Sequence, residues 1–307
     1  MKETTLSVDY EFPEGPSQGP DGFIYVAEMG GARISRFGIV GERELFAPIE
    51  GSPGATAFGP DGAVYVTNNG GLAFANGRPA GISDPNSGGS IDKIDPDGRV
   101  QRLYTECDGT PLVAPNDLVF DQGDSFYFTD PEHGDMFTTP IVWPPGHVYW
   151  ATIDGRHIKR VATDYELSNG IAITPDGGTL LVCETLRSKI WAHEIRGPGQ
   201  IGPRVLFGDL PEGHMPDGCC IDIEGNVIAA AVGAGALVVL DSSGKVVDRI
   251  ETEDTDVTNV CFVGPNIDAR RTLIATEGLL GRVVSFEWPR AGLVPFPERS
   301  LITHPLT

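Results

Sequence analysis

Two carboxylates and two carboxamides recur at one position of a repeated sequence motif. In each copy this position precedes a Gly-containing turn by about eight residues, and a short β-rich run follows the turn. The six copies place at this position Glu14, Gly54, Asn116, Asn169, Asp217 and Thr258. Carboxylate and amide oxygens are the ligands that hard divalent cations prefer. Because neither His nor Cys occupies the position, calcium is favoured, and magnesium, manganese and zinc are kept as alternatives.

The alternative interpretation of these residues is a polar axis filled by water. Carboxylates that face one another repel, and burying them away from water is costly. A divalent cation between Glu14 and Asp217 removes that cost, and Asn116 and Asn169 complete an oxygen ligand set. We therefore expect one divalent cation, with calcium as the first choice, held by these four residues.

Short strands separated by tight turns must bring these distant residues together. Repeats of this length made of short strands indicate a propeller or a solenoid. The copies predict an all-β fold, a six-bladed β-propeller with four-stranded blades around a central metal-binding channel, as one domain over residues 1–307. Asp-Gly pairs such as Asp21-Gly22 predict type I′ turns, in which both central residues have positive φ. The run Thr5 to Phe12 is expected to complete the last blade and close the ring.

The composition agrees with this architecture and excludes two classes of partner. The 40 Gly and 25 Pro of the 307 residues are spread along the chain, as many short strands and turns require. The formal net charge of -21 argues against nucleic acid and anionic membrane surfaces, because both would be repelled. An acidic surface also serves solubility alone, and part of the excess can attract a cation.

Cysteine usage indicates a reducing compartment. The five cysteines are odd in number and have no Cys-x-x-Cys spacing, so buried free thiols are expected. No basic-then-apolar N-terminal signal is found, and the apolar run Val227 to Leu240 is too short to span a bilayer. That run is interpreted as two strands joined by the turn at Gly233 to Gly235. We expect a cytoplasmic protein that is a monomer or a small homo-oligomer.

Two long connections are predicted to lie on the same face as the oxygen ligands. They run from Thr67 to Gly89 and from Asp130 to Gly146, where they can roof a central pocket, although long loops are often only surface decoration. The second connection carries Glu132, His133 and Trp143, a mixture suited to binding an organic ligand.

Five short segments resemble the senescence marker protein (regucalcin)/gluconolactonase family of six-bladed propeller lactonases. The resemblance extends over nearly the whole chain, and similar sites occur in diisopropylfluorophosphatase and, more remotely, in the paraoxonases. The segments are Pro13-Glu14-Gly15-Pro16, Pro115-Asn116-Asp117-Leu118-Val119, Phe128-Thr129-Asp130-Pro131, Ser168-Asn169-Gly170-Ile171-Ala172 and Pro216-Asp217-Gly218.

The resemblance implies roles for the four oxygen-bearing residues. Glu14, Asn169 and Asp217 match the direct metal ligands of the family, and Asn116 matches a residue that binds the metal or touches the substrate beside it. Asp217 also matches the residue assigned as base or nucleophile. Two departures concern the substrate. Ala114 stands where the animal branch has Arg, and Glu132-His133-Gly134 stands where gluconolactonases often have an aromatic residue followed by Gly.

The resulting hypothesis is metal-dependent hydrolysis of a lactone ring, in which the metal polarises the carbonyl and Asp217 acts as base or nucleophile. His214, three residues before Asp217, is a candidate to contact the substrate and share the proton transfer, or else is an exposed loop residue. One alternative is a phosphotriesterase or arylesterase with the same metal site. The other is a calcium-binding propeller without enzymatic activity. No Gly-x-Ser-x-Gly, His-Glu-x-x-His or P-loop motif supports another chemistry.

Overall fold

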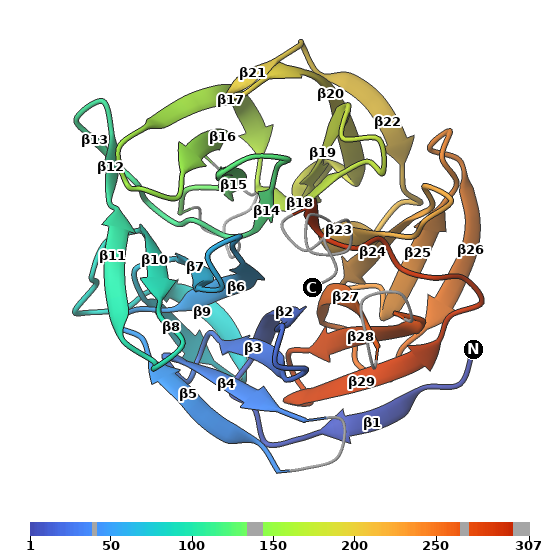
Figure 1. Cartoon of the computed structure of the whole chain (residues 1–307). Helices are drawn as coiled ribbons and strands as arrows, with labels where there is room; N and C mark the ends of the chain where they lie inside the picture. The colour runs from blue at the N-terminus through green and yellow to red at the C-terminus, as the bar shows by residue number, and fades with distance from the viewer. Residues whose placement is uncertain (39–41, 134–143, 265–269, 297–307) are drawn as a thin grey trace, which may run out of the picture.

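The computed structural model of the chain is a ring of six antiparallel sheets around a central axis (Figure 1). It describes residues 1–38, 42–133, 144–264 and 270–296. The all-β class and the six-bladed propeller predicted from the repeats are confirmed.

Each blade follows the chain from the axis outwards. The first blade contains β2 (Pro13–Gln18), β3 (Ile24–Glu28), β4 (Arg33–Phe37) and β5 (Glu44–Pro48). The second contains β6 (Pro53–Phe58), β7 (Val64–Asn68), β10 (Ser90–Ile94) and β11 (Val100–Tyr104). The third contains β14 (Leu118–Phe120), β15 (Ser125–Asp130), β16 (Pro145–Thr152) and β17 (Ile158–Glu166). Two small hairpins lie outside the blades, β8 (Leu72–Ala75) with β9 (Arg78–Ile82) and β12 (Glu106–Cys107) with β13 (Thr110–Pro111).

The last three blades repeat the arrangement. The fourth blade contains β18 (Ser168–Ile173), β19 (Thr179–Glu184), β20 (Lys189–Gly197) and β22 (Val205–Asp209), with β21 (Gln200–Ile201) beside β20. The fifth contains β23 (Met215–Ile221), β24 (Val227–Val232), β25 (Ala236–Leu240) and β26 (Val246–Glu251). The sixth contains β27 (Val257–Val263), β28 (Thr272–Glu277), β29 (Arg282–Glu287) and β1 (Thr4–Ser7). The apolar run before residue 240 therefore forms two strands, as predicted.

The N-terminal segment completes the last blade. Strand β1 pairs antiparallel with β29, with Thr4 opposite Ser285 and Thr5 opposite Val284. The expected closure of the ring is therefore confirmed, and the strand that provides it is shorter than the predicted run, since it ends at Ser7 and not at Phe12.

The Asp-Gly turn after the innermost strand of the first blade differs from the predicted type. At the first turn Gly22 has a φ of +83°, while Asp21 is not among the residues with positive φ. The Gly22 amide donates to the carbonyl of Gly19, so Pro20 and Asp21 are the central residues. Proline at the first central position fits an ordinary type I turn, and the glycine after it takes the left-handed conformation. The type I′ prediction was wrong because it ignored the preceding proline.

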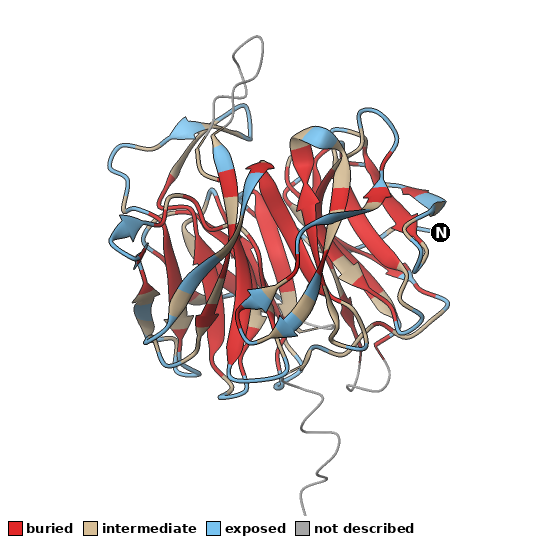
Figure 2. Ribbon diagram, turned by 90° about the horizontal axis from the view of Figure 1, so that it is seen from above, coloured by how far each residue is buried: buried red, intermediate tan, exposed pale blue. Residues whose placement is uncertain are grey.

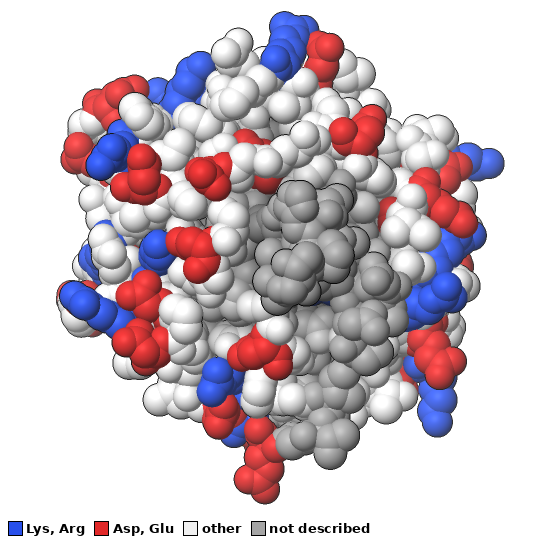
Figure 3. All heavy atoms as spheres, in the orientation of Figure 1, with Lys and Arg blue, Asp and Glu red and all other residues white. Residues whose placement is uncertain are grey.

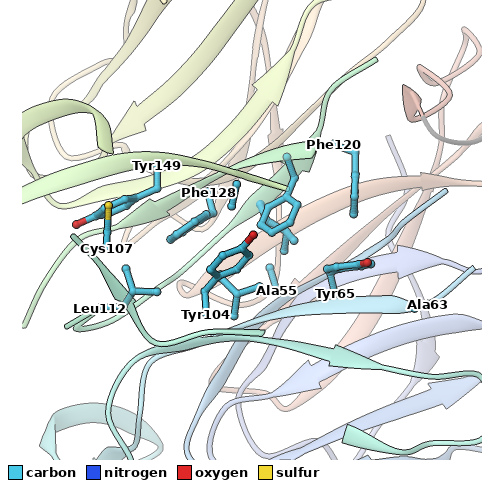
Figure 4. Close-up of a cluster of buried hydrophobic side chains, with 13 residues drawn as sticks. Ala55, Ala63, Tyr65, Tyr104, Cys107, Leu112, Phe120, Phe128 and Tyr149 are labelled. Carbon is cyan, nitrogen blue, oxygen red and sulfur yellow. The ribbon is translucent and has the colours of Figure 1, made fainter. Parts of the chain in front are cut away.

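Apolar side chains fill the spaces between adjacent blades. Six clusters of buried residues each lie between two neighbouring blades. Between the second and third blades, Tyr65 packs edge-on against Phe120 at 5.1 Å, and Phe128 stacks on Tyr149 at 5.1 Å (Figure 4). The buried residues accordingly lie within the blades, and the outer strands and turns are exposed (Figure 2). Packing of this kind makes the ring rigid enough to position side chains at its axis.

The surface carries its excess acid in a dispersed form on the face seen in Figure 3. There acidic and basic side chains are interspersed around the rim of the ring. No helix in the part of the chain that the structure describes is long and apolar enough to cross a membrane. The five cysteines, all within that part, are free thiols.

Candidate active site

Irregular pairing turns the predicted ring residues out of the regular ladder. The register between the first and second strands shifts at Glu14 in β2, around Asn169 in β18 and around Asp217 in β23. The corresponding stretches of β6 and β27 contain the same shift. Bulges of this kind bend a strand and re-aim its side chains, and they are common beside active sites. Five of the six copies of the sequence motif therefore share one local distortion at the axis, whereas β14 of the third blade pairs regularly from Leu118 onwards.

Small residues after the ring positions let the inner strands approach closely. A Cβ added to Gly170 would lie 2.2 Å from the Asp217 carbonyl oxygen, and one added to Gly218 would lie 2.0 Å from Cγ of Asn259. Gly15 is equally tight, since an added Cβ would lie 2.1 Å from Cα of Ala55. No side chain fits at these places without movement of the neighbouring strand.

Threonine hydroxyls tie the innermost segment of four blades to the preceding blade of the ring. Each donates to a main-chain carbonyl at or beside a ring position: Thr67 to Asn116 at 2.5 Å, Thr129 to Asn169 at 2.8 Å, Thr185 to Pro216 at 2.8 Å and Thr258 to Pro13 at 2.9 Å. These bonds satisfy carbonyls that the bulges leave outside the ladder. They also leave the ring side chains free to point elsewhere.

Two buried carboxyl groups face one another at the axis. Glu14 and Asp217 are 5% and 8% exposed. Burial raises the pKa of Glu14 well above its ordinary value, and the nearby carboxyl of Asp217 raises it further. Burial likewise raises the pKa of Asp217 well above its ordinary value, helped by Asp117. Two acids that destabilise each other's charge in this way require a cation or protons.

The carboxamide of Asn169 lies beside this pair. Its side chain is hydrogen-bonded to Asp217, and it is 5% exposed. Its oxygen Oδ1 is buried without a hydrogen-bond partner. A buried amide oxygen without a partner costs free energy, on the order of 1–3 kcal/mol, unless something accepts its lone pairs. A cation is such a partner.

Two further residues of the site were not predicted as functional. Asp117 is buried next to Glu14 and Asp217, and burial raises its pKa to about 7. Its carboxylate accepts hydrogen bonds from the amides of Leu118 at 2.7 Å and Ile171 at 3.4 Å. Asn259 contributes a side-chain hydrogen bond to both Glu14 and Asp117. The sequence did contain a signal for Asp117, because an acidic residue stands there between Asn116 and the apolar run that follows it.

Asn116 occupies the equivalent place in the third blade. It directly precedes Asp117 and is half-buried, and its amide donates to the carbonyl of Thr129 at 2.9 Å. Because the Thr129 hydroxyl binds the Asn169 carbonyl, Asn116 and Asn169 are held through the same residue. The structure therefore places all four predicted ligands on the inner edge of the ring, three of them with direct electrostatic or hydrogen-bond contacts among them.

The donor set fits a hard divalent cation. Glu14, Asp217, Asn169 and Asn116 offer carboxylate and amide oxygens and no nitrogen or sulfur, which suits calcium. Within the described ranges no group of three or more His, Cys, Asp or Glu is arranged to hold a metal ion. A metal centre built from His or Cys is thus not found in those ranges. Two of the four candidate ligands here are Asn residues, which such a group does not include.

The predicted substrate residues of the third blade lie near this edge. The His133 ring is hydrogen-bonded to the carbonyl of Asn69, and its Nε2 is buried without a partner. Burial lowers the pKa of His133, so the ring is neutral at pH 7. The side-chain amide of Asn69 in turn donates a hydrogen bond to the carbonyl of Pro115, which directly precedes Asn116. Glu132 instead lies 3.5 Å from Nε2 of His147.

The two remaining predicted residues are not brought to the axis by any described contact. His214 accepts a hydrogen bond of 2.9 Å from Arg249, which lies on the outermost strand β26 of its blade, and its other ring nitrogen lies 3.3 Å from the carbonyl of Glu212. Trp143 lies outside the residues that the structure describes.

A narrow cavity continues the axis on the other side of the ring residues. It has a volume of about 170 Å³. Asp117 and Asn259 line the end nearest the site, and Leu293 to Phe296 border the cavity as well. The Leu293 amide donates to the carbonyl of Ile221 at the far end of β23, which places this segment opposite the ring residues. This segment therefore lies on the face of the ring opposite to the connection between β7 and β10.

The sequence profile of the SMP-30/Gluconolactonase/LRE-like region matches residues 12–276. The chain belongs to this family. Diisopropyl-fluorophosphatase from Loligo vulgaris is 28% identical over 217 residues, which cover 67% of each chain. Lactonase drp35 from Staphylococcus saprophyticus is 31% identical over 55% of this chain and 51% of its own length. The alignment thus spans about half of that lactonase.

Solved structures of the family have the same fold. A protein from Xanthomonas campestris described as a gluconolactonase superposes with a TM-score of 0.75, at 23% identity over 94% of this chain and 89% of its own. Regucalcin from Agrobacterium tumefaciens, described as a calcium-binding protein, superposes with a TM-score of 0.73, at 18% identity over 94% of both chains. At this identity the likeness establishes the propeller and nothing about the reaction.

Proposed function

We propose that this protein is a metal-dependent hydrolase that opens a lactone ring. The observation that carries the proposal is the pair of buried carboxyl groups, Glu14 and Asp217, whose proximity raises the pKa of Glu14, together with the unpartnered amide oxygen of Asn169. Ion pairs with the protein's own cations would explain buried acids elsewhere, but the causes that act on these two are burial and other carboxyl groups. The family includes relatives named as lactonases, which supports the same reaction class.

The residues of the site divide the chemistry among them. Glu14, Asn169, Asp217 and Asn116 would hold the cation, which when bound supplies a Lewis acid that polarises the ester carbonyl. Asp217 then either accepts a proton from the attacking water or attacks the carbonyl carbon directly. Asn259 holds the Glu14 side chain by its hydrogen bond and so fixes the geometry from the opposite side. The threonine bonds behind the ring hold the main chain at or beside these residues to the neighbouring blades.

The nature of the cation follows from the donor set. We propose calcium, because the oxygens are hard and come from four separate blades, which allows the irregular, larger coordination shell that calcium takes. The relative from Agrobacterium tumefaciens is described as calcium-binding, and this supports the choice. Magnesium, manganese and zinc are the alternatives that a metal titration distinguishes.

A related hydrolase activity is the second candidate. The same donor set can polarise a P=O group, and the relative with the longest sequence match quoted above is named diisopropyl-fluorophosphatase. A calcium-binding propeller without enzymatic activity is the third.

Initial rates decide among these candidates. The protein is assayed with a panel of lactones and with paraoxon-type phosphotriesters, in calcium, after chelation and after calcium is restored. Hydrolysis of lactones that chelation abolishes and calcium restores supports the proposal. Faster turnover of phosphotriesters favours the second candidate. Metal binding that raises the melting temperature without any turnover favours the third.

We also propose a single domain, a cytoplasmic location and a monomeric or small homo-oligomeric state. The free thiols support a reducing compartment. Light scattering of the purified protein and limited proteolysis test the state of assembly and the domain.

A further inference from the structure

The hairpin β8–β9 leaves the second blade and ends on the sixth. It forms part of the long connection after β7. At its base the Leu72 amide donates to Oγ of Ser52 at 2.9 Å. Near its tip Arg78 donates to both carboxylate oxygens of Asp256, at 2.7 and 2.9 Å, across 178 residues of sequence. The hairpin therefore passes over the first blade.

The residues beneath the hairpin occupy equivalent places above the ring of ligands. Phe12, Ser52 and Asp256 each stand two residues before a ring position, those of residues 14, 54 and 258. Their carbonyls accept equivalent hydrogen bonds, from Met29 to Phe12 at 3.0 Å, from Asn69 to Ser52 at 2.9 Å and from Gly278 to Asp256 at 2.8 Å. The hairpin thus follows the rim of the site along three of the six blades.

The contact of Arg78 with Asp256 anchors the free end of the hairpin. The Asp256 side chain is only 9% exposed, whereas Arg78 is half-exposed. The rigid fork of a guanidinium fits a carboxylate in one orientation, so this pair fixes direction as well as distance. The loss of Arg78 would leave Asp256 buried without its cation and the hairpin attached mainly at its base.

The anchored hairpin presents an aromatic pair at the rim. The Phe74 ring lies 5.6 Å from the Phe12 ring at an angle of 58°. Phe12 is buried against Gly278, where an added Cβ would lie 2.7 Å from the ring, so it cannot withdraw. Phe74 is half-buried, and it therefore keeps surface for another apolar group. Phe12 directly precedes the inner strand β2 and stands two residues before Glu14 in the sequence.

We propose that Phe74 and Phe12 form an apolar subsite for the substituent of the substrate, so that the enzyme prefers alkyl- or aryl-substituted lactones to polyhydroxylated sugar lactones. The inference rests on the proposed lactonase function. The rim positions of the other three blades support it, because they are Ala114, Leu167 and Met215 and offer no side-chain donor for sugar hydroxyls. Arg78 is a positioning residue in this arrangement, since it acts through the hairpin.

The test compares two substrates, D-glucono-δ-lactone and a δ-lactone with an unbranched alkyl chain, on four variants and on the conservative replacement Arg78→Lys. Phe74→Ala removes the subsite and Arg78→Met removes its anchor. Leu45→Ala and Arg156→Met are the matched controls, because both residues are exposed, on β5 and in the turn between β16 and β17. Circular dichroism and melting temperatures establish that all four variants fold.

The wild type should hydrolyse the alkyl lactone with at least about tenfold higher kcat/KM than the sugar lactone. Phe74→Ala should lower kcat/KM for the alkyl lactone by about tenfold, mainly through KM, and change the sugar lactone less than twofold. Arg78→Met should have a similar but smaller effect, which Arg78→Lys restores in part. A wild type that prefers the sugar lactone, or a Phe74→Ala variant that affects both substrates equally, would overturn the proposal.

A second measurement separates this proposal from the lactonase function itself. Calorimetry follows binding of the alkyl δ-lactam, which is not turned over, to the calcium-loaded wild type and Phe74→Ala proteins. Weaker binding to the variant supports the subsite even if no lactone is hydrolysed. Equal binding to both proteins overturns the subsite whatever the catalytic assay shows.

Discussion

The Thr129 hydroxyl donates a hydrogen bond of 2.8 Å to the main-chain carbonyl of Asn169. Thr129 belongs to the second strand of the third blade and Asn169 to the innermost strand of the fourth, so one blade positions the ring residue of the next. The Thr129 carbonyl also accepts a hydrogen bond from the main-chain amide of Asn116. A single residue outside the site thereby sets the relative placement of two of its residues, Asn169 through its hydroxyl and Asn116 through its carbonyl.

Substitution of Thr129 by Val should weaken cation binding without removal of any ligand. The valine keeps the volume but leaves the Asn169 carbonyl without a donor, which costs about 1–3 kcal/mol of unfolding free energy. We expect a several-fold weaker calcium affinity by isothermal titration calorimetry and a lower urea midpoint. Thr5→Val, on the exposed strand β1, should change neither quantity. An unaltered affinity in Thr129→Val would show that Asn169 does not depend on this bond.

Neutral replacements of the two axial acids should separate activity from stability. Glu14→Gln and Asp217→Asn should each lower kcat on the order of 100-fold or more, because the cation loses a charged ligand. In the presence of a chelator the same variants should be as stable as the wild type or more stable, since each replaces a buried acid whose ionisation is unfavourable by a neutral amide. Glu106→Gln and Asp154→Asn, both exposed, are the controls. Retention of the full rate by Asp217→Asn would refute its assigned role.

The metal-free protein should lose stability as the pH rises. Burial raises the pKa of Asp117 from 3.8 to about 7, so the folded chain holds a proton that the unfolded chain has released. The free energy of unfolding therefore falls between about pH 4 and pH 7, by an amount on the order of 4 kcal/mol for this group. The raised pKa values of Glu14 and Asp217 act in the same direction.

Calcium should remove this dependence, because a bound cation favours the ionised carboxylates. Melting temperatures from pH 4.5 to pH 8, in chelator and in calcium, check both statements. A melting temperature that rises with pH in chelator would contradict the buried, protonated state of these acids.

A methyl group between two inner strands should disturb the site through the backbone. In Gly170→Ala the new Cβ would lie 2.2 Å from the Asp217 carbonyl oxygen, so one of the strands must move. We expect a loss of about 1–3 kcal/mol in unfolding free energy and a marked loss of calcium affinity. Gly123→Ala is the matched control, since its added Cβ would meet nothing closer than 3.5 Å. Urea unfolding and calcium titration of both variants provide the comparison.

The two candidate histidines should respond differently to truncation. His133 is tied to Asn69 beside the site, and we expect His133→Ala to lower kcat/KM by about tenfold through lost substrate contact. His214 is hydrogen-bonded to Arg249 of the outer strand β26, and we expect His214→Ala to change the rate less than twofold. A large effect on kcat in His214→Ala would instead support the shared proton transfer suggested by its position near Asp217.

The repeated turn signals were sufficient to predict the propeller and the strands that carry the ring residues. Each copy contains its own strand and turn pattern, so local sequence determines the blade. Asp117 and Asn259 were not assigned, because a strand pattern does not say which of two adjacent polar residues faces the axis. In the sixth copy Thr258 stands at the ring position, but its hydroxyl binds Pro13, and the neighbouring Asn259 reaches Glu14 instead.

The course of the β8–β9 hairpin could not be predicted for a different reason. Its end is held by an ion pair between residues 178 positions apart, and neither Arg78 nor Asp256 belongs to a repeated motif. Contacts of this kind depend on how the blades are placed around the ring, and the local pattern of one sequence does not predict that placement. The long connection was recognised from its length alone.

The pairing of β1 with β29 joins the beginning of the described chain to its last blade. Glu14 and Asp217 come from the first and fifth blades, so their final distance is set only when that seam has formed. The appearance of tight calcium binding in a refolding experiment should coincide with closure of the circle, which makes the ion a natural reporter of the last step of assembly.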